Sequence, residues 1–192
     1  MTRRYDQIIV IDIECTCWEG KTPPDMEHEI IEIGICPLRP DTGERLERRS
    51  ILVKPQRSTV SAFCTQLTSL TQEQVDQGIP FADACTILEK QYRTRQRVWA
   101  SYGDYDRQQF ERQCAAWGVP YPFSPSHLNV KTLFTLIRAL RHDVGMAQAL
   151  EIMQIPLEGR HHRGDDDAWN VAQMLHLLLN ERREMPHNGS HG

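Results

Sequence analysis

The hydrophobic pattern of the chain centres on an unbroken apolar run, residues 8–11, which leads into Asp12, Ile13 and Glu14. The run consists of four β-branched residues, so it predicts a strand buried on both faces of a mostly parallel sheet. Side chains two positions apart in a strand point to the same face, and Asp12 and Glu14 are therefore expected to lie side by side. Open α/β sheets bind ligands at the carboxyl ends of such strands. The pattern thus predicts a central strand with an acidic site at its end.

The remaining pattern supplies further strands and helices. Strands are expected at residues 29–35 and 46–53, joined by turn chemistry into an antiparallel hairpin, and at residues 97–102 and 127–130. Two helices are expected from their start signals, one at a capping box at residues 71–74 and one after Pro80. Four more are expected from apolar spacing, at residues 105–117, 133–140, 146–153 and 165–179. Together these elements predict an α/β fold with a mixed five-stranded central sheet flanked by helices.

Composition narrows the class of protein. The 192 residues, 40% hydrophobic and 25% charged, predict one globular α/β domain at residues 1–184, followed by a polar, flexible tail at 185–192. No apolar stretch approaches a membrane span, and the amino terminus does not resemble a signal sequence, so a cytoplasmic protein is expected. Six scattered cysteines indicate reduced thiols, and the spacing of Cys15 and Cys17 is too short for a zinc knuckle. The net charge of −4 argues against a clamp on long nucleic acid, but it leaves room for a site that handles a chain end through bound metal ions.

Two other places concentrate acidic and basic groups at element boundaries. Asp104 and Asp106 follow the predicted strand at 97–102, and His161 and His162 precede three consecutive aspartates at residues 165–167. Taken alone, the aspartate triplet is explained by helix capping, because Asp is favourable in the first helical turn. The histidine pair, taken alone, is explained as part of an exposed loop. The combination of Asp-x-Glu, a second strand-end Asp and His-x4-Asp favours a single acidic site.

In this combination the chain resembles the DEDDh family of 3′-to-5′ exonucleases, which have a ribonuclease H-like fold. More narrowly, it resembles the ERI-type RNA exonucleases, which include the histone-mRNA 3′ exonucleases. The resemblance covers about residues 5–180. It is carried by five short motifs in order, at residues 12–17, 28–32, 63–71, 103–106 and 159–170.

The resemblance implies a role for particular residues. The metal-binding carboxylates of the family correspond to Asp12, Glu14, Asp106 and Asp167, with Glu14 also counted as catalytic, and the general base corresponds to His162. At two places the family motif can be aligned with either of two neighbouring residues. Asp106 is preferred to Asp104 because of its place before the helical run that reaches Phe110, and His162 with Asp167 is preferred to His161 with Asp166 because of the Gly-Arg-x-His pattern and Ala168.

The implied chemistry suits these residue types. An all-carboxylate site suits hard cations, so two Mg²⁺ or Mn²⁺ ions are expected. Such a pair, roughly 4 Å apart, activates a water and stabilises both oxygens of the displacement. His162, with an ordinary pKa of about 6.5, takes the proton of the attacking water. The segment 159–164 has glycine at both ends and is expected to be mobile until substrate binds. The product is a nucleoside 5′-monophosphate, released from a free 3′ end.

The resemblance also implies the partner, single-stranded nucleic acid with RNA preferred over DNA; it does not identify protein partners. Stacking on Tyr105 is expected, where close relatives have Trp. A DNA-directed proofreading or repair exonuclease and a non-catalytic nucleic-acid-binding module of the same fold remain the alternatives. The residues expected to contact the terminal nucleotide are Cys15, Phe63, Leu67, Thr68, Tyr105 and His162.

Overall fold

The computed structural model describes residues 4–181; the tail predicted at 185–192 lies outside the described residues. Five strands form one sheet in the order β3-β2-β1-β4-β5. β1 pairs with β4 in parallel and with β2 antiparallel, β4 pairs with β5 in parallel and β2 pairs with β3 antiparallel. This confirms the mixed five-stranded sheet. The strands are β1 (Ile8–Cys15), β2 (Ile30–Leu38), β3 (Arg49–Leu52), β4 (Val98–Ser101) and β5 (His127–Asn129).

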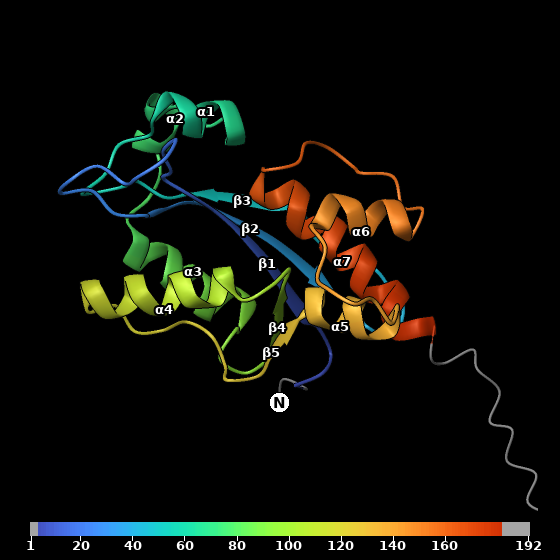
Figure 1. Cartoon of the computed structure of the whole chain (residues 1–192). Helices are drawn as coiled ribbons and strands as arrows, with labels where there is room; N and C mark the ends of the chain where they lie inside the picture. Colours follow the sequence, from blue (N-terminus) through green and yellow to red (C-terminus); the bar gives the residue numbers. More distant parts are fainter. Residues whose placement is uncertain (1–3, 182–192) are drawn as a thin grey trace, which may run out of the picture.

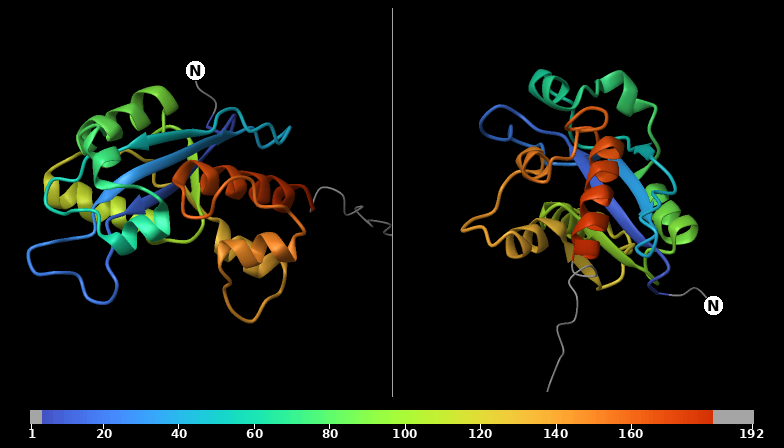
Figure 2. Two further views of the ribbon diagram at one scale, coloured as in Figure 1. Left: turned by 90° about the horizontal axis from the view of Figure 1, so that it is seen from above. Right: turned by 90° about the vertical axis from the view of Figure 1, so that its right-hand side faces the viewer.

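Helices cover both faces of this sheet. In Figure 1, α3 and α4 lie on one side of the strands, α5, α6 and α7 lie on the other, and α1 and α2 lie beyond one end of the sheet. The views in Figure 2 show α7 crossing over the strands along much of its length. The helices are α1 (Ala62–Thr68), α2 (Gln72–Asp76), α3 (Phe81–Tyr92), α4 (Tyr105–Trp117), α5 (Val130–Ile137), α6 (Met146–Ile152) and α7 (Gly164–Glu181).

The side chains of β1 alternate between two cores. Ile9 and Ile11 pack in the core beneath α3 and α4, whereas Ile8 and Val10 pack in the core beneath α5 and α7. Asp12 and Glu14 continue the even-numbered series, so the face that begins apolar becomes acidic toward the carboxyl end of the strand. The two-residue period of the strand therefore points both carboxylates toward the side on which α7 lies.

The helices depart from the expected pattern at two places. The capping box at Thr71 and Gln74 is present and opens α2. However, α1 forms in a segment for which the pattern predicted no helix, with Ser61 as its N-cap. Similarly, α5 ends at Ile137 instead of continuing to Leu140, although Leu140 still packs against the core beneath α7. Ser61 caps the start of α1, and Ala139, with a left-handed φ of 50°, follows the end of α5, so local backbone features and not apolar periodicity set these boundaries.

Two glycines allow α7 to approach the sheet closely. Asp12 pairs with Gly34 across β1 and β2, and Gly164 at the start of α7 lies against this pair. A methyl group added at Gly34 would lie only 1.8 Å from the backbone carbonyl of Gly164. The absence of a side chain at Gly34 thus brings the first turn of α7 directly over Asp12.

The described helices are all too short or too polar to cross a membrane. The cytoplasmic location and the single-domain boundaries at residues 1–184 stay predictions.

Candidate active site

Four of the predicted acidic residues come together at the carboxyl end of β1. Carboxylate oxygens of Asp12, Glu14 and Asp167 all lie within 4.8 Å of one another. Glu14 and Asp167 are 8% and 3% exposed, whereas Asp12 is partly open. These three residues and Asp106 line one cavity of about 360 Å³. Strand β1 and the first turns of α4 and α7 therefore supply one acidic pocket.

The short length of β4 explains the place of Asp106. The parallel pairing of β1 with β4 covers Ile8 to Val10, so the backbone of β1 runs on beyond it. Oδ1 of Asp106, at the start of α4, accepts a hydrogen bond of 3.0 Å from the N–H of Ile13. Asp106 is 5% exposed. The side chain thus closes the edge of β1 beside the two strand carboxylates, and the choice of Asp106 over Asp104 as a metal ligand stays a prediction.

Neighbouring acids that compete in the sequence are held elsewhere. Asp104 accepts hydrogen bonds from Arg107 and from Asn129, at 3.3 Å and 3.0 Å. Asp166 forms an ion pair with Arg48 and accepts from the backbone N–H of Arg160. Both are therefore tied to basic or amide groups outside the acidic cluster.

Burial and mutual repulsion raise the affinity of the cluster for positive charge. Burial, together with the charges of Asp106 and Asp167, raises the pKa of Asp12 well above its usual range. Burial and the same kind of repulsion raise the pKa of Glu14 to about 8. Burial raises the pKa of Asp106 to about 7, against the hydrogen bonds that favour its charged form. A cluster whose carboxylates resist ionisation is stabilised by a bound cation.

Both histidines of the predicted His-x4-Asp motif lie at this pocket. Nδ1 of His161 lies 3.0 Å from Oδ2 of Asp167, while His162 donates its backbone N–H to the same oxygen at 2.9 Å. The two rings stack with centroids 3.9 Å apart. His162 has a left-handed backbone, φ 65°, which turns the chain into α7. The geometry brings both candidates to Asp167, and the choice of His162 as the base stays a prediction.

A buried glutamate, to which the sequence assigned no role, anchors this histidine segment. Glu32 on β2 is 0% exposed, and Arg163 donates to it at 2.9 Å. The N–H of Gly164 donates to the other carboxylate oxygen, also at 2.9 Å, and Ser50 donates to Oε1. Residues more than 100 positions apart are thereby joined, and the sequence offered only the presence of Glu32 within a family motif as a signal.

The cavity is completed by residues that sequence reasoning missed. Lys131, in the first turn of α5, lies 5.5 Å from the ring centroid of Tyr102, and its charge favours ionisation of Asp106. Gly103, with a positive φ of 112°, lies in the turn from β4 into α4. The missed lining residues are Ile13, Tyr102, Lys131, Gly145 and Met146.

The predicted substrate contacts divide into three kinds. Tyr105 lines the cavity and is 50% exposed, and burial together with the neighbouring thiol of Cys15 raises the pKa of its hydroxyl. Phe63 is 38% exposed on α1, with Leu67 half-buried on the same helix, and both lie outside the cavity lining. Thr68 is fully buried.

The hydroxyl of Thr68 is used within its own helix end. It donates to the carbonyl of Cys64 at 2.9 Å and accepts from the N–H of Leu70 at 3.1 Å. The expected polar contact from Thr68 to a nucleotide does not fit this arrangement. Thr68 instead stabilises the turn that connects α1 to the following segment.

The donor set fits a hard divalent cation. Asp12, Glu14 and Asp167 offer carboxylate oxygens, which suit Mg²⁺ and Mn²⁺, and the cluster lacks the thiolate ligands that favour zinc. His161, His162 and Asp167 form a second group with ligand atoms within 4.8 Å, so Asp167 is shared by both. The raised pKa values of Asp12, Glu14 and Asp106 point to the same conclusion.

Comparison with known proteins decides the family. A family model described as an exonuclease, RNase_T, matches residues 9–175. The chain belongs to this exonuclease family. It is 30% identical to human 3′-5′ exoribonuclease 1 over 194 residues, covering 94% of this chain and 54% of the human protein. It is 26% identical to the probable 3′-5′ exonuclease KapD of Bacillus subtilis, covering 93% of this chain and 87% of that protein.

Solved structures give the same assignment within the exonuclease family. The nuclease domain of 3′hExo, a DEDDh family member, bound to rAMP, matches with a TM-score of 0.80 and 28% identity over 92% of this chain and 93% of that one. A 3′-exonuclease that recognises the histone mRNA stem-loop matches with a TM-score of 0.78 and 27% identity, over 92% of this chain and 64% of that one. The predicted family and the ribonuclease H-like fold are thereby confirmed. The chain spans about half the length of the human protein that it matches.

Proposed function

We propose that this protein is a metal-dependent 3′-to-5′ exonuclease that removes nucleoside 5′-monophosphates from single-stranded nucleic acid, with RNA preferred over DNA. The observation that carries the proposal is the convergence of Asp12, Glu14, Asp106 and Asp167 in one pocket with a histidine on Asp167. Relatives named exoribonucleases support the RNA preference.

Asp12, Glu14, Asp106 and Asp167 would hold two Mg²⁺ or Mn²⁺ ions. When bound, such ions supply Lewis-acid stabilisation of a phosphate and lower the pKa of a water molecule. The chain itself positions the four carboxylates on three elements. Asp106 is oriented by the N–H of Ile13, and Asp167 is oriented by the N–H of His162. Because these bonds come from the backbone, the carboxylates are positioned before substrate arrives.

His162 is proposed to accept the proton of the attacking water. Burial and the neighbouring His161 lower the pKa of His162, which keeps its ring neutral and able to accept a proton at pH 7. The hydrogen bond to Asp167 raises the pKa of His161. The ring of His161 therefore orients the Asp167 carboxylate. This difference favours His162 over His161 as the base.

The terminal base is proposed to stack on Tyr105, with Phe63 and Leu67 on α1 at its other side. The N-cap of α1 is held to the chain just beyond β1, because Ser61 donates to the carbonyl of Cys17 at 2.6 Å. Aromatic stacking tolerates any base. Tyr105 and α1 therefore support binding of a chain end independent of sequence.

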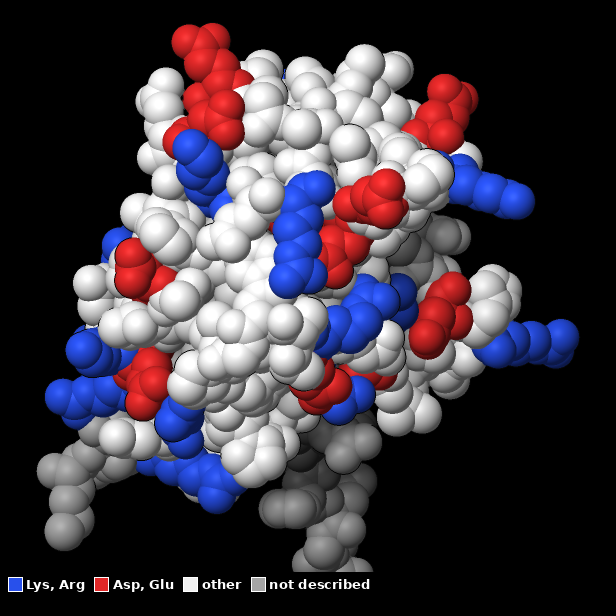
Figure 3. Space-filling view, turned by 90° about the vertical axis from the view of Figure 1, so that its left-hand side faces the viewer, with Lys and Arg blue, Asp and Glu red and all other residues white. Residues whose placement is uncertain are grey.

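The charge distribution supports recognition of ends over recognition of long nucleic acid. Basic and acidic side chains are interspersed on the face that Figure 3 shows, and the whole chain has a net charge of −4. Tight binding of long nucleic acid relies on many phosphate contacts. We therefore expect short single-stranded ends as the preferred substrates.

Degradation of matched RNA and DNA oligonucleotides tests the proposal. Single strands labelled at the 5′ end are incubated with Mn²⁺, with Mg²⁺ or with a chelator, beside the same strands labelled at the 3′ end. The proposal expects a ladder of 5′-labelled products that shortens from the 3′ end, requires metal and forms faster on RNA. The 3′-labelled strands should release labelled mononucleotide first.

The Asp12→Ala protein is the control for a contaminating nuclease. Equal rates on RNA and DNA would remove the RNA preference and keep the reaction. No cleavage of either strand with metal present would contradict the proposed activity and favour a binding module of the same fold.

A further inference from the structure

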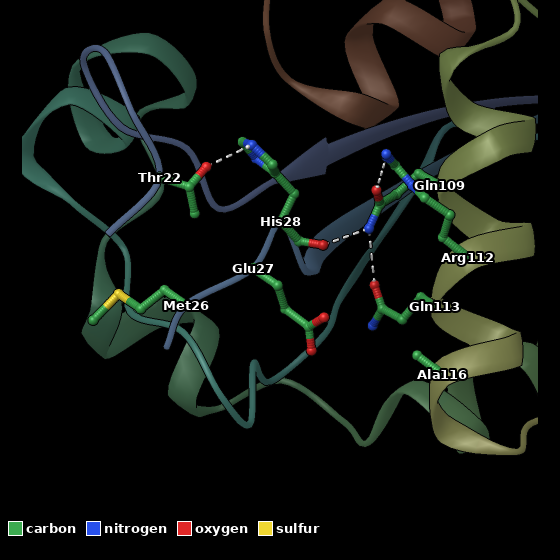
Figure 4. Close-up of a pocket in the computed structure, with 8 residues that line it drawn as sticks. All are labelled: Thr22, Met26, Glu27, His28, Gln109, Arg112, Gln113 and Ala116. Atoms are coloured by element: carbon green, nitrogen blue, oxygen red, sulfur yellow. Dashed lines mark hydrogen bonds between the residues drawn. The ribbon is translucent and has the colours of Figure 1, made fainter. Parts of the chain in front are cut away.

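A second cavity, of about 400 Å³, lies outside the acidic pocket, between α4 and the segment that precedes β2. Figure 4 shows Thr22, Met26, Glu27 and His28 on one side, facing side chains of α4 on the other. The volume falls in the range of small-ligand sites. Gln109, Arg112 and Gln113 form the wall on α4, so the lining is mostly polar. The acidic chemistry proposed above uses none of these residues.

The side-chain amide of Gln113 has a buried nitrogen without a hydrogen-bond partner among residues 4–181. Its Oε1 accepts hydrogen bonds from the N–H of Ile30 at 2.9 Å and from Nε2 of Gln109 at 3.3 Å. The bond from Ile30 fixes which end of the amide is oxygen. Nε2 of Gln113 is buried, and within residues 4–181 it has no hydrogen-bond partner. Because buried donors are almost always hydrogen-bonded, this nitrogen remains available to the acceptor atom of a bound molecule.

Glu27 places an acceptor on the facing wall. Ser58 holds the backbone of Glu27 on both sides, accepting from its N–H at 2.9 Å and donating to its carbonyl at 2.6 Å. The carboxylate of Glu27 carries one ion pair, to Arg57 at 3.0 Å, at the outer edge. Figure 4 shows the Glu27 carboxylate and the Gln113 amide nitrogen directed into the same space. The cavity therefore presents a donor opposite a negatively charged acceptor.

The cavity borders the same helix, α4, as the proposed binding place of the terminal base. Asp106, Gln109 and Gln113 occupy positions i, i+3 and i+7 of α4, so the acidic pocket and this cavity border the same buried face of one helix. Burial raises the pKa of the Tyr105 hydroxyl, and the nearby charge of Arg112 opposes this effect. Arg112 also donates to Gln109. Arg112 lies between Tyr105 and Gln113 in the sequence of α4 and lines the cavity, so its guanidinium offers a phosphate contact to a strand that extends from Tyr105 toward the cavity.

We propose that this cavity binds a base of the substrate strand upstream of the terminal nucleotide, and that it prefers a base with an exocyclic amino group beside a ring acceptor. This inference rests on the proposed exonuclease function. The amino group of cytosine donates to Glu27, and its ring N3 accepts from Nε2 of Gln113. Uracil has a carbonyl in place of the amino group, which faces the Glu27 carboxylate unfavourably. Recognition of unstacked bases through their edges is the usual way in which proteins read single-stranded RNA.

A single cytosine moved through an oligouridine strand tests the proposal. Single-turnover degradation with Mn²⁺ is followed on 5′-labelled strands that differ only in the position of the cytosine. One upstream position should raise the rate of terminal cleavage about five- to tenfold over uridine, as expected for one edge-specific pair of hydrogen bonds. The Glu27→Gln protein should lose this preference.

Two further variants separate the cavity from general effects. Glu111→Gln removes one negative charge from the far side of α4, where Glu111 pairs with Arg107, and should keep the cytosine preference. Gln113→Glu keeps the acceptor for Ile30 but replaces the donor, and should lose the preference. If Gln113→Glu does not fold, as judged by its melting temperature, the surface variant Glu27→Gln still shows whether the cavity causes the cytosine preference.

The outcomes distinguish this inference from the proposed function. Hydrolysis of the p-nitrophenyl ester of thymidine 5′-monophosphate by the wild-type protein tests the acidic pocket alone, because that substrate has no upstream base. Hydrolysis of the ester combined with equal rates for cytosine and uridine at every position would overturn the cavity assignment alone. A preference that survives in Glu27→Gln would overturn it as well. Failure on the ester and on all strands would remove both.

Discussion

Asp12 is a carboxylate whose pKa both burial and the neighbouring charges raise. Burial and four neighbouring carboxylates raise its pKa, so in the absence of metal its ionised form is opposed by Asp106, Asp167, Glu14 and Glu32. A bound divalent cation reverses this situation, since it favours every ionised carboxylate around it. The charge of Asp12 therefore lowers the stability of the metal-free protein and strengthens the binding of metal.

Asp12→Ala should therefore abolish turnover without unfolding the protein. We expect the rate of oligonucleotide degradation to fall by at least roughly a thousandfold, because the metal loses a ligand. The melting temperature without metal should stay equal or rise, because like-charge repulsion is relieved. Mn²⁺ should raise the melting temperature of the wild-type protein and not that of the variant. Near-normal degradation by Asp12→Ala would contradict the site assignment.

The two stacked histidines predict different mutant behaviour. His162→Ala should lower the single-turnover rate by about a hundredfold or more while the melting-temperature shift with Mn²⁺ is preserved, as expected for a lost general base. His161→Ala removes the side-chain bond to Asp167 and should weaken the Mn²⁺ shift as well. If His161→Ala instead gives the larger loss of rate with intact Mn²⁺ binding, the general base is His161 and not His162.

At the scale of elements, the contact between β2 and α7 holds Asp167 and His162 over β1. Gly34 allows the backbone of Gly164 to lie against the sheet, and Glu32 binds the N–H of Gly164 and the side chain of Arg163. All these groups lie on β2 or at the start of α7. The distance between the strand carboxylates and Asp167 is therefore set by the packing of these two elements.

Gly34→Ala should separate the two elements. The added methyl group would meet backbone atoms of Gly164 and Asp165, which cannot turn aside as a side chain can. We expect a loss of about 1–3 kcal/mol in the free energy of unfolding, from denaturant titration, together with weaker Mn²⁺ binding. Gly145→Ala is the matched control for stability, because Gly145 has an ordinary φ of −67° and open space around its α-carbon. Equal stabilities of the two variants would contradict this view of the contact.

The sequence predicts the parts of the site that depend on local periodicity. Asp12 and Glu14 share a face because of the strand period, and Asp106 was chosen from its place before a helix. The close approach at Gly34 was not predictable, because it depends on how α7 crosses β2. The anchor at Glu32 was missed for the same reason, since its partner Arg163 lies 131 positions away.

At the scale of the whole molecule, the pH dependence of stability combines groups with opposite effects. Glu14 and Asp106 have raised pKa values, so the folded state gains protons relative to the unfolded state as the pH falls through 8 and 7. His127 on β5 acts in the other direction. Its ring lies against Trp99, with centroids 4.2 Å apart, and burial lowers its pKa to about 4. Only a comparison between variants isolates its contribution.

The unfolded state binds a proton on His127 near pH 6.5, whereas the folded state binds it only near pH 4. Between these values the unfolded state holds more protons, so the stability that His127 contributes is complete above pH 6.5 and is lost as the pH falls toward 4. His127→Gln should be less stable than the wild type at pH 7.5, because the ring packing on Trp99 is lost. By pH 5 the gap between the two free energies of unfolding should narrow by about 2 kcal/mol.

Denaturant titrations of both proteins at pH 7.5 and pH 5 measure this change, and the titrating carboxylates of the pocket cancel in the difference. A gap that stays constant would mean that His127 is protonated in the folded protein at pH 5. In that case the ring would be charged between Trp99 and Ser101, and Asp104, whose Oδ1 lies 3.8 Å from its Nδ1, would have to be its partner. Asp104→Asn would then destabilise the protein at pH 5 more than at pH 7.5, whereas a neutral His127 predicts no such difference.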